Sequence, residues 1–386
     1  MLEFKRIINL PFLLEQKSFF LLGPRATGKS FLIKQQLSKD AILFNLLKTD
    51  LFFKLSSAPW ELEGMINAEL QKNKNLGWIV IDEIQKVPAL LDEVHRLIEE
   101  KGLRFLLTGS SARKLKRGHA NLLAGRAWVA HLFPLVYKEI PNFDLDKYLL
   151  YGGLAPVYSS KYPQEELNAY VRTYLYEEIQ AEGLVRKIPQ FSRFLHTAAL
   201  SNGQLINFAQ IASDTGMAAS TIKEHYSILE DTLLGFRLNP WIKSKKRKAI
   251  STSKFFLFDL GVTNTLAQIN TLERNSDLYG RSFEHWLIIE IKAYLDYTRK
   301  NEELCFWRSK SGMEVDIIIG NHTAVEIKAS KRVSREDLSG LKALAEENII
   351  KNLYLVSHDP FETISNNINI RHWKSFIEDL WAGKII

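Results

Sequence analysis

Residues 18–30 read SFFLLGPRATGKS, and the fold of the first third of the chain can be predicted from them. The apolar run 18–22 is typical of a short buried strand, and the following FLIKQQL suits a helix. A strand, a glycine-containing loop and a helix form the context that a phosphate-binding loop requires, and the loop fulfils G-x-x-x-x-G-K-[ST]. The sequence therefore predicts a nucleotide site made of these residues: Gly23, Pro24, Arg25, Ala26, Thr27, Gly28, Lys29 and Ser30.

The residue types in this loop each have a chemical reason. The glycines let the backbone fold so that consecutive N–H groups point at phosphate oxygens. Lys29 can reach the β and γ phosphates, which makes it a predicted catalytic residue, and Ser30 offers its hydroxyl to Mg²⁺. ATP and Mg²⁺ are the ligands that we expect here.

A second strand, WIVI at residues 78–81, ends in Asp82 and Glu83. A buried parallel strand that ends in two carboxylates needs a reason, because burying unpaired charge is costly. In a Walker B element, Asp82 would order the Mg²⁺ shell and Glu83 would orient or deprotonate the attacking water. A solvated strand end is the alternative, and the phosphate-binding loop favours the functional interpretation.

A third strand, LRFLL at residues 103–107, runs into three hydroxyl residues, Thr108, Ser110 and Ser111. They would lie at the carboxyl end of the sheet, where ligands bind in open α/β folds. Ser110 is the candidate sensor of the γ-phosphate, and an ordinary Gly-Ser turn is the alternative.

An arginine that neutralises transition-state charge is a recurring part of ATP-hydrolysing sites. Arg126, in the loop-like stretch LLAGRAWVAHLFPL, is the candidate for this role, and Arg113 is its rival. A solvated surface position is the alternative for both side chains.

The set GPRATGKS, IVIDEIQ, LLTGSSA, LAGR and YGGLAPVY resembles a large bacterial and archaeal family of AAA-like P-loop ATPases. Members of that family carry a C-terminal domain of unknown function with a nuclease-like core. The resemblance covers essentially the whole chain, because the later motifs follow in the family's order. It implies an α/β fold with a parallel-sheet ATPase core in residues 1–140 and a helical lid or linker in residues 141–188. YGGLAPVY is a signature of the lid region, and we assign it no chemistry.

Residues 189–260 have the pattern of a winged helix-turn-helix. Two helices, a turn at Gly216 and a helix with Ile222, Tyr226 and Leu229 on one face precede two apolar stretches that can supply wing strands. DNA is the expected partner, met by the exposed face of the recognition helix and gripped by a basic run. The residues involved are Ser220, Thr221, Lys223, Glu224, Lys243, Lys245, Lys246, Arg247 and Lys248. A packing or protein-interaction module with a solvated basic loop is the alternative.

Residues 261–386 contain a second candidate site. A helix with a 3.6-residue apolar period has Glu284 at its start, and two strands meeting near Gly312 are followed by a third, TAVEIKAS. Glu326 and Lys328 are two apart on that strand, so their side chains leave the same face. Asp316 lies ten residues before Glu326, which is enough for a hairpin that brings the two carboxylates together.

A helix glutamate, a strand aspartate and E-x-K together resemble the PD-(D/E)XK nuclease core. The resemblance implies that Glu284, Asp316 and Glu326 hold Mg²⁺ and that Lys328 orients water or stabilises the pentavalent phosphate. Retained cleavage stays open, because filled positions do not prove metal binding.

Composition limits the classes of protein that this chain can belong to. Its 386 residues are 46% hydrophobic and 25% charged, the balance of an ordinary globular protein. The net charge of +7 arises in residues 1–260, since residues 261–386 carry −2, so a polyanion should meet the first part. A single cysteine, Cys305, excludes an internal disulfide and fits a reducing, cytoplasmic location. No leader peptide or membrane-spanning segment is expected.

Two functions from different classes fit these patterns. The first is a DNA-directed enzyme in which ATP hydrolysis repositions the winged helix and the nuclease-like domain. The second is an ATP-dependent regulatory or assembly switch whose C-terminal domain binds without cleaving. The oligomeric state is left open, and a homo-oligomer is compatible with both functions.

Overall fold

The computed structural model describes residues 4–73, 75–111, 123, 125–175 and 188–386. They divide into two compact units. One, the N-terminal unit, comprises Glu3–Leu135 and Asp231–Leu234. The other, the C-terminal unit, comprises Met1–Leu2, Val136–Glu230 and Gly235–Ile386.

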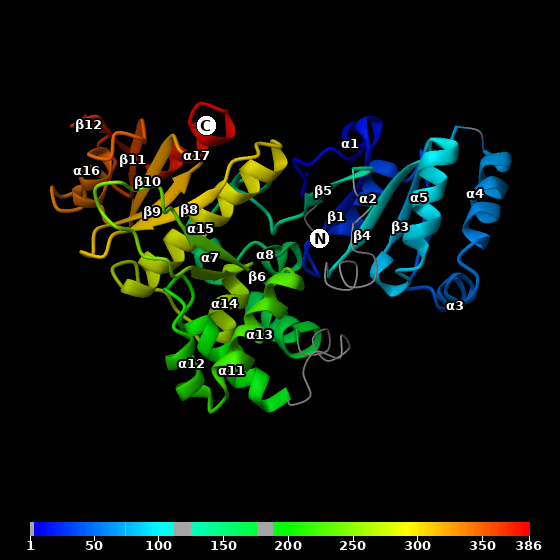
Figure 1. The fold of residues 1–386 in the computed structure, drawn as a ribbon, viewed down its shortest axis with the longest axis horizontal. Coiled ribbons are helices and arrows are strands. Elements are labelled where there is room, and N and C mark those ends of the chain that lie inside the picture. The colour runs from blue at the N-terminus through cyan, green and yellow to red at the C-terminus, as the bar shows by residue number, and fades with distance from the viewer. Residues whose placement is uncertain (1–3, 74, 112–122, 124, 176–187) are drawn as a thin grey trace. The chain divides into compact units, whose positions relative to one another are not determined.

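The N-terminal unit contains a parallel sheet of five strands in the order β2-β3-β4-β1-β5 (Figure 1). All four neighbouring pairs are parallel, which confirms the expected α/β fold with a parallel sheet in this region. The strands are β1 (Ser18–Leu22), β2 (Ala41–Asn45), β3 (Trp78–Asp82), β4 (Arg104–Gly109) and β5 (Ala127–His131). The helices are α1 (Leu10–Gln16), α2 (Lys29–Leu37), α3 (Thr49–Ser57), α4 (Glu61–Lys72) and α5 (Leu90–Lys101), with a 3₁₀ turn η1 (Ile84–Lys86).

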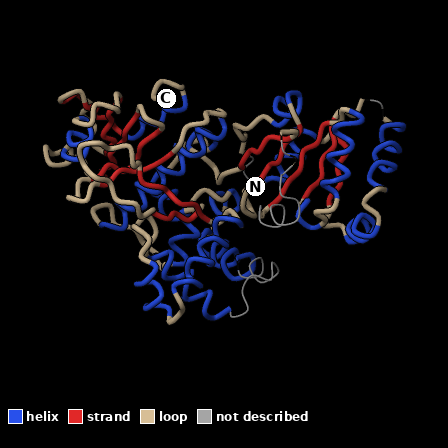
Figure 2. Tube along the Cα trace, viewed as in Figure 1, coloured by secondary structure: helices blue, strands red, loops and turns tan. Residues whose placement is uncertain are grey.

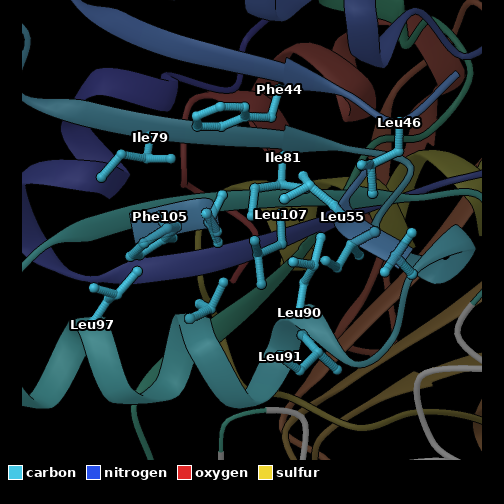
Figure 3. Packing of buried hydrophobic residues seen from close by; sticks show 14 of the residues in the cluster. Phe44, Leu46, Leu55, Ile79, Ile81, Leu90, Leu91, Leu97, Phe105 and Leu107 are labelled. Carbon is cyan, nitrogen blue, oxygen red and sulfur yellow. The ribbon is translucent and has the colours of Figure 1, made fainter. Parts of the chain in front are cut away.

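Apolar side chains of the strands pack on the helices that follow them. Ile79 and Ile81 of β3 and Phe105 and Leu107 of β4 share one buried cluster with the apolar face of α5, including Leu97 (Figure 3). Alternate residues of a strand point to one face, so this face of the sheet is closed by α5, and the polar strand ends remain for a site.

The first part of the C-terminal unit is helical (Figure 2). Its helices are α7 (Leu145–Tyr151), α8 (Ala155–Ser159), α9 (Pro163–Ala169), the π-helical η3 (Tyr170–Leu175), α11 (Ile188–Leu200), α12 (Phe208–Thr215), α13 (Ala219–Asp231) and α14 (Leu260–Leu266). Helix α12 ends at Thr215, and the following Gly216 has a φ of 67°, the left-handed cap conformation that glycine adopts most readily. Helix α13 buries Ile222, Tyr226 and Leu229, the face that the sequence predicts, and leaves Lys223 exposed.

The rest of this unit is an eight-stranded mixed sheet in the order β12-β13-β11-β10-β9-β8-β6-β7. Its strands are β6 (Gly235–Pro240), β7 (Lys254–Leu257), β8 (Leu304–Arg308), β9 (Glu314–Ile319), β10 (Thr323–Lys328), β11 (Asn352–Ser357), β12 (Thr363–Ser365) and β13 (Ile368–His372). Its helices are α15 (Asp277–Tyr297), α16 (Ser339–Ala345) and α17 (Trp373–Trp381).

Strands β6 and β7 lie in the segment that the sequence assigns to the wing, yet they extend this sheet. Asn239 and Pro240 of β6 pair in parallel with Cys305 and Phe306 of β8, and β7 pairs antiparallel with β6. The sheet therefore crosses the expected boundary at residue 260, and residues of the wing segment reach the C-terminal carboxylates.

Helix α15 corrects one detail of the sequence analysis. Glu284 was expected at the helix start, but the helix begins at Asp277 with the Ser276 hydroxyl accepting a hydrogen bond from the N–H of Tyr279 (3.2 Å). Residues 277–282 thus form an additional stretch of helix, capped by Ser276, before the apolar pattern begins. Glu284 therefore lies inside the helix. Within the described part of the chain, no helix is long and apolar enough to cross a membrane.

Candidate functional site

The phosphate-binding loop connects β1 to α2. Gly28 caps α2 with a φ of 94°, and Ala26 also has a positive φ, 61°. At Gly23 a Cβ atom would lie 2.5 Å from the carbonyl oxygen of Leu132, so only glycine fits. The loop therefore brings the chain to the start of α2, where the first N–H groups have no partner within the helix and can bind an anion.

The side chain of Lys29 folds back over this loop. Its Nζ donates hydrogen bonds to the carbonyl oxygens of Gly23 (2.7 Å) and Pro24 (3.0 Å), and the side chain is buried. The ammonium thus lies where the loop would enclose phosphates. Thr27 fixes the loop from within, because its Oγ1 donates to the carbonyl of Pro24 (2.8 Å). Arg25 lies half-buried in the same loop.

Arg6 supports the loop from outside the motif. Its guanidinium donates to the carbonyl oxygens of Thr27 and Phe133, each at 2.7 Å, and the residue is buried. Sequence reasoning missed Arg6, because it lies 21 residues before Thr27 and belongs to no motif. A buried positive charge against the loop favours the binding of phosphate there.

Ser30, Asp82 and Thr108 meet at the carboxyl ends of β1, β3 and β4. Ser30 Oγ donates to Asp82 Oδ2 (3.0 Å), and Thr108 Oγ1 donates to Asp82 Oδ1. Asp82 is only 2% exposed, so these two hydroxyls orient its carboxylate. A serine hydroxyl beside an oriented carboxylate is a donor set that suits Mg²⁺.

Glu83 turns away from β3 with a positive φ of 62°. Its N–H donates to Thr108 Oγ1 (3.1 Å), and its carboxylate accepts a hydrogen bond from Gln85 Nε2. Ser110 lies within 3.5 Å of the same Glu83 oxygen and accepts from Gln85 Nε2 (3.2 Å). Gln85 and Thr108 therefore position the predicted base. Gln85 was not singled out from the sequence, although it follows Glu83 by two residues.

Arg126 is not brought to this loop within the chain. It directly precedes β5, whose first residue Ala127 pairs with Ser18, the first residue of β1. The phosphate-binding loop follows the other end of β1, and Arg126 forms an ion pair with Glu99 of α5. The parallel register of β5 on β1 thus separates Arg126 from the phosphate-binding loop by the length of a strand. Its rival Arg113 lies outside the described residues.

In the C-terminal unit, Asp316, Glu326 and Lys328 lie together on the neighbouring strands β9 and β10. Lys328 Nζ is 2.6 Å from Glu326 Oε1, and Asp316 Oδ2 accepts a hydrogen bond from the N–H of Ile327 (2.8 Å). Glu326 is 6% exposed, and its buried Oε2 has no hydrogen-bond partner within the described part of the chain. The hairpin predicted from the ten-residue spacing thus brings these side chains to one place.

Asp316 and Glu326 are two buried carboxyl groups with raised pKa values. Burial, and then the charge of Glu284, raise the pKa of Asp316 above its ordinary value. Burial and the neighbouring Asp316 raise the pKa of Glu326 well above its ordinary value. Burial works against the charge of Lys328, but Glu326 and Asp316 outweigh it and raise the lysine pKa. Two buried carboxylates that resist ionisation together form a site that a cation would stabilise.

Glu284 is held by a lysine that sequence reasoning missed. Lys254, the first residue of β7, places Nζ 3.0 Å from Glu284 Oε1 and 2.9 Å from Glu314 Oε1. Among the described residues, no three His, Cys, Asp or Glu side chains gather closely enough to form a metal-binding group. The structure thus brings Asp316 and Glu326 together and gives Glu284 a lysine partner; the three-carboxylate metal site stays a prediction.

The YGGLAPVY stretch has a structural explanation. The buried carboxylate of Asp259 accepts hydrogen bonds from the N–H groups of Gly153 (2.8 Å) and Val262 (3.0 Å). A Cβ atom on Gly152 would lie 2.2 Å from Asp259 Oδ1, and one on Gly261 would lie 2.0 Å from the carbonyl of Tyr151. These glycines permit close packing of α7 and α14. The motif therefore stabilises the contact between these two helices within the C-terminal unit.

The basic run 243–248 is fixed by one carboxylate. Glu347 accepts hydrogen bonds from the N–H groups of Lys245 (2.7 Å), Lys246 (2.8 Å) and Arg247 (3.1 Å). Lys245 and Lys246 nevertheless keep exposed side chains, while Arg247 pairs with Glu346 (2.8 Å). The loop is thus a positioned set of cations rather than a loose segment.

Comparison with known proteins gives three consecutive matches. Residues 15–141 match an AAA domain, residues 142–273 a domain of unknown function (DUF8612), and residues 279–372 another domain of unknown function (DUF4143). None of these three family models spans the whole chain.

Relatives occur in bacteria and archaea, each named as an uncharacterized protein. One from Mycobacterium tuberculosis is 27% identical over 278 residues, which are 69% of this chain and 62% of the relative. One from Methanocaldococcus jannaschii is 24% identical over 340 residues, 80% of this chain and 73% of the relative. One from Haemophilus influenzae is 23% identical over 296 residues, 70% and 72% of the two chains. The chain thus spans less than two thirds of the mycobacterial protein. Together with the loop geometry, the AAA match supports an AAA-like P-loop ATPase module in residues 15–141 and, at family level, ATP binding or hydrolysis.

Proposed function

We propose that the protein hydrolyses Mg²⁺-ATP in its N-terminal unit and couples this reaction to DNA binding and cation-dependent DNA cleavage by its C-terminal unit. The AAA match supports the first step at family level. The observation that carries the second is the buried pair Asp316 and Glu326, with Lys328 2.6 Å from Glu326 and Glu326 Oε2 without a partner.

In the ATPase step, the N–H groups at the start of α2 bind phosphate oxygens and Lys29 neutralises their charge. Ser30 and Asp82 would hold Mg²⁺, which would neutralise negative charge on the phosphates. Glu83 accepts a proton from the attacking water or orients it, and Gln85 and Ser110 fix the carboxylate that does so.

In the cleavage step, Asp316 and Glu326 are the cation ligands of the C-terminal unit. The fit rests on the unpartnered Glu326 oxygen, since two carboxylates with water and substrate phosphate complete the oxygen set that Mg²⁺ prefers. When bound, the cation would supply Lewis-acid stabilisation of the phosphate. Lys328 orients the attacking water or stabilises negative charge on the phosphate, because its ammonium lies beside Glu326.

DNA reaches this unit through two exposed groups of side chains. Lys245 and Lys246 project from a loop that Glu347 holds in place, and Lys223 is exposed on α13. Phosphate contacts from such lysines supply affinity that does not depend on base sequence. The winged-helix assignment of α12, α13 and the two following strands belongs to this proposal.

A second candidate is an ATP-dependent regulatory switch whose C-terminal unit binds without cleaving. The ion pair between Lys254 and Glu284 favours it, because it engages the third predicted carboxylate with a lysine. The two candidates differ in a single measurable property, which is cleavage.

The test compares wild type with Asp316→Asn and with Asp277→Asn, a matched control at the exposed start of α15. Each protein is incubated with single- and double-stranded DNA and with RNA, with Mg²⁺ or Mn²⁺, and with or without ATP. We expect wild type and the control to cleave DNA and Asp316→Asn to hydrolyse ATP without cleaving. Intact ATP hydrolysis without cleavage by any of the three proteins would favour the switch.

A further inference from the structure

Lys254 is a charged group buried inside the carboxylate cluster of the C-terminal unit. Its side chain is 6% exposed, and its ammonium lies between Glu284 Oε1 (3.0 Å) and Glu314 Oε1 (2.9 Å). The ring of Phe306 lies beneath it, with the ammonium 5.3 Å from the ring centre. A lysine removed from water in this way persists only with strong partners.

The partners of Lys254 belong to the group that surrounds Asp316. Two carboxylates within 3.0 Å of the ammonium stabilise its positive charge inside the protein. The other oxygen of Glu314 lies 3.3 Å from the guanidinium of Arg308. Glu284 and Glu314 therefore share Lys254. Glu326 pairs with Lys328 through Oε1, while its buried Oε2 has no hydrogen-bond partner among the described residues.

Two-metal sites in nucleases and polymerases hold their two divalent ions about 4 Å apart. In this cluster, the two sides would be neutralised by cations of different kinds. On the side of Glu284 the charge is a lysine of the chain itself. On the side of Asp316 and Glu326, the buried Oε2 of Glu326 has no hydrogen-bond partner among the described residues and can bind an ion from solution.

We propose that Lys254 is a built-in cation that takes the place of a second divalent ion and limits the cluster to one divalent ion, held by Asp316 and Glu326. This inference rests on the proposed function only in taking those two carboxylates as cation ligands. It adds that the first residue of β7, outside the sequence pattern of the site, sets the number of ions. The lysine keeps Glu284 from binding a divalent ion.

The experiment counts Mn²⁺ bound to the full-length protein without nucleotide, by calorimetry and by the electron paramagnetic resonance signal of free Mn²⁺. Asp316→Asn measures the ions bound elsewhere. Lys254→Met removes the ammonium at nearly constant length. The matched control is Lys292→Met on α15, whose ammonium lies over the Phe236 ring, 4.8 Å from its centre.

We expect one Mn²⁺ at the cluster in wild type and in Lys292→Met, and two in Lys254→Met. Electron paramagnetic resonance of the bound ions should then show the coupling of a Mn²⁺ pair in Lys254→Met alone. Two ions in wild type, or an unchanged count and affinity in Lys254→Met, would overturn the proposal.

Lys254→Met leaves Glu284 and Glu314 without their shared partner and can impair folding. Lys254→Met/Glu314→Gln removes one of these charges, keeps Glu284, and is expected to bind two ions as well. If this variant is folded and binds one, the proposal fails. A wild type that binds one ion but cleaves no DNA contradicts the proposed cleavage while leaving the role of Lys254 intact, so the two failures are distinguishable.

Discussion

Thr108→Val is the sharpest perturbation of the ATPase site. The side chain is fully buried, and its hydroxyl donates to Asp82 and accepts the N–H of Glu83 (3.1 Å). Valine keeps the shape and removes both hydrogen bonds. A hydrogen bond to a charged group contributes roughly 1.5–3 kcal/mol, and an unsatisfied buried N–H costs about 1–3 kcal/mol.

Most of the free energy of these two hydrogen bonds contributes to the stability of the folded protein. The rate of hydrolysis is affected only through the orientation of Asp82 and Glu83. If about 1.4–2.7 kcal/mol of it acts in the transition state, kcat falls about 10- to 100-fold. ATP affinity should change little, because Lys29 and the loop N–H groups are untouched.

The assay measures steady-state ATP hydrolysis and equilibrium binding of a fluorescent ATP analogue, with Thr108→Ser as the hydroxyl-preserving control. We expect Thr108→Ser to keep most of the rate. A folded Thr108→Val that hydrolyses ATP at the wild-type rate would refute the idea that this hydroxyl positions the two carboxylates.

Three further predictions concern the C-terminal unit. Burial raises the pKa of Glu290 to about 8 from an ordinary 4.5, so the folded state binds its proton more tightly and loses stability as pH rises from about 4.5 to 8. At 1.36 kcal/mol per pKa unit, this loss is at most about 5 kcal/mol. Glu290→Gln should flatten that slope in denaturant unfolding at pH 5 and pH 8, and equal slopes would contradict it. Gly152→Ala should destabilise the unit by about 3 kcal/mol or more, because residue 152 has a φ of +73° and the new Cβ would lie 2.2 Å from Asp259. An unchanged melting temperature would contradict the structural role of this glycine in the YGGLAPVY motif. Lys245→Ala/Lys246→Ala should lower the slope of log affinity for DNA against log salt by about 2, and an unchanged slope would show that these lysines contact no phosphate.

Features that depend on neighbouring residues could be predicted from the sequence. The loop from Gly23 to Ser30 has its geometry because Gly28 ends one turn and starts α2. Asp82 and Glu83 were found because a buried strand ends there, and Asp316 and Glu326 because a hairpin spacing separates them. In each case local chain geometry places the side chains.

Features that depend on strand order could not be predicted. Arg126 is separated from the loop by the parallel register of β5 on β1, which no motif encodes. Lys254 reaches Glu284 because β6 pairs with β8, so a segment assigned to the wing enters the C-terminal sheet. Arg6 and Gln85 each act through two hydrogen bonds that leave no pattern in the sequence.

Under the proposed function, ATP hydrolysis in one unit is coupled to DNA bound by the other. The most direct measurement is the rate of ATP hydrolysis by the full-length protein as DNA is added, with Glu83→Gln as the blank. We expect a rate that rises with DNA and saturates, with weaker stimulation of Lys245→Ala/Lys246→Ala. A rate independent of DNA, in protein that hydrolyses ATP, would contradict it.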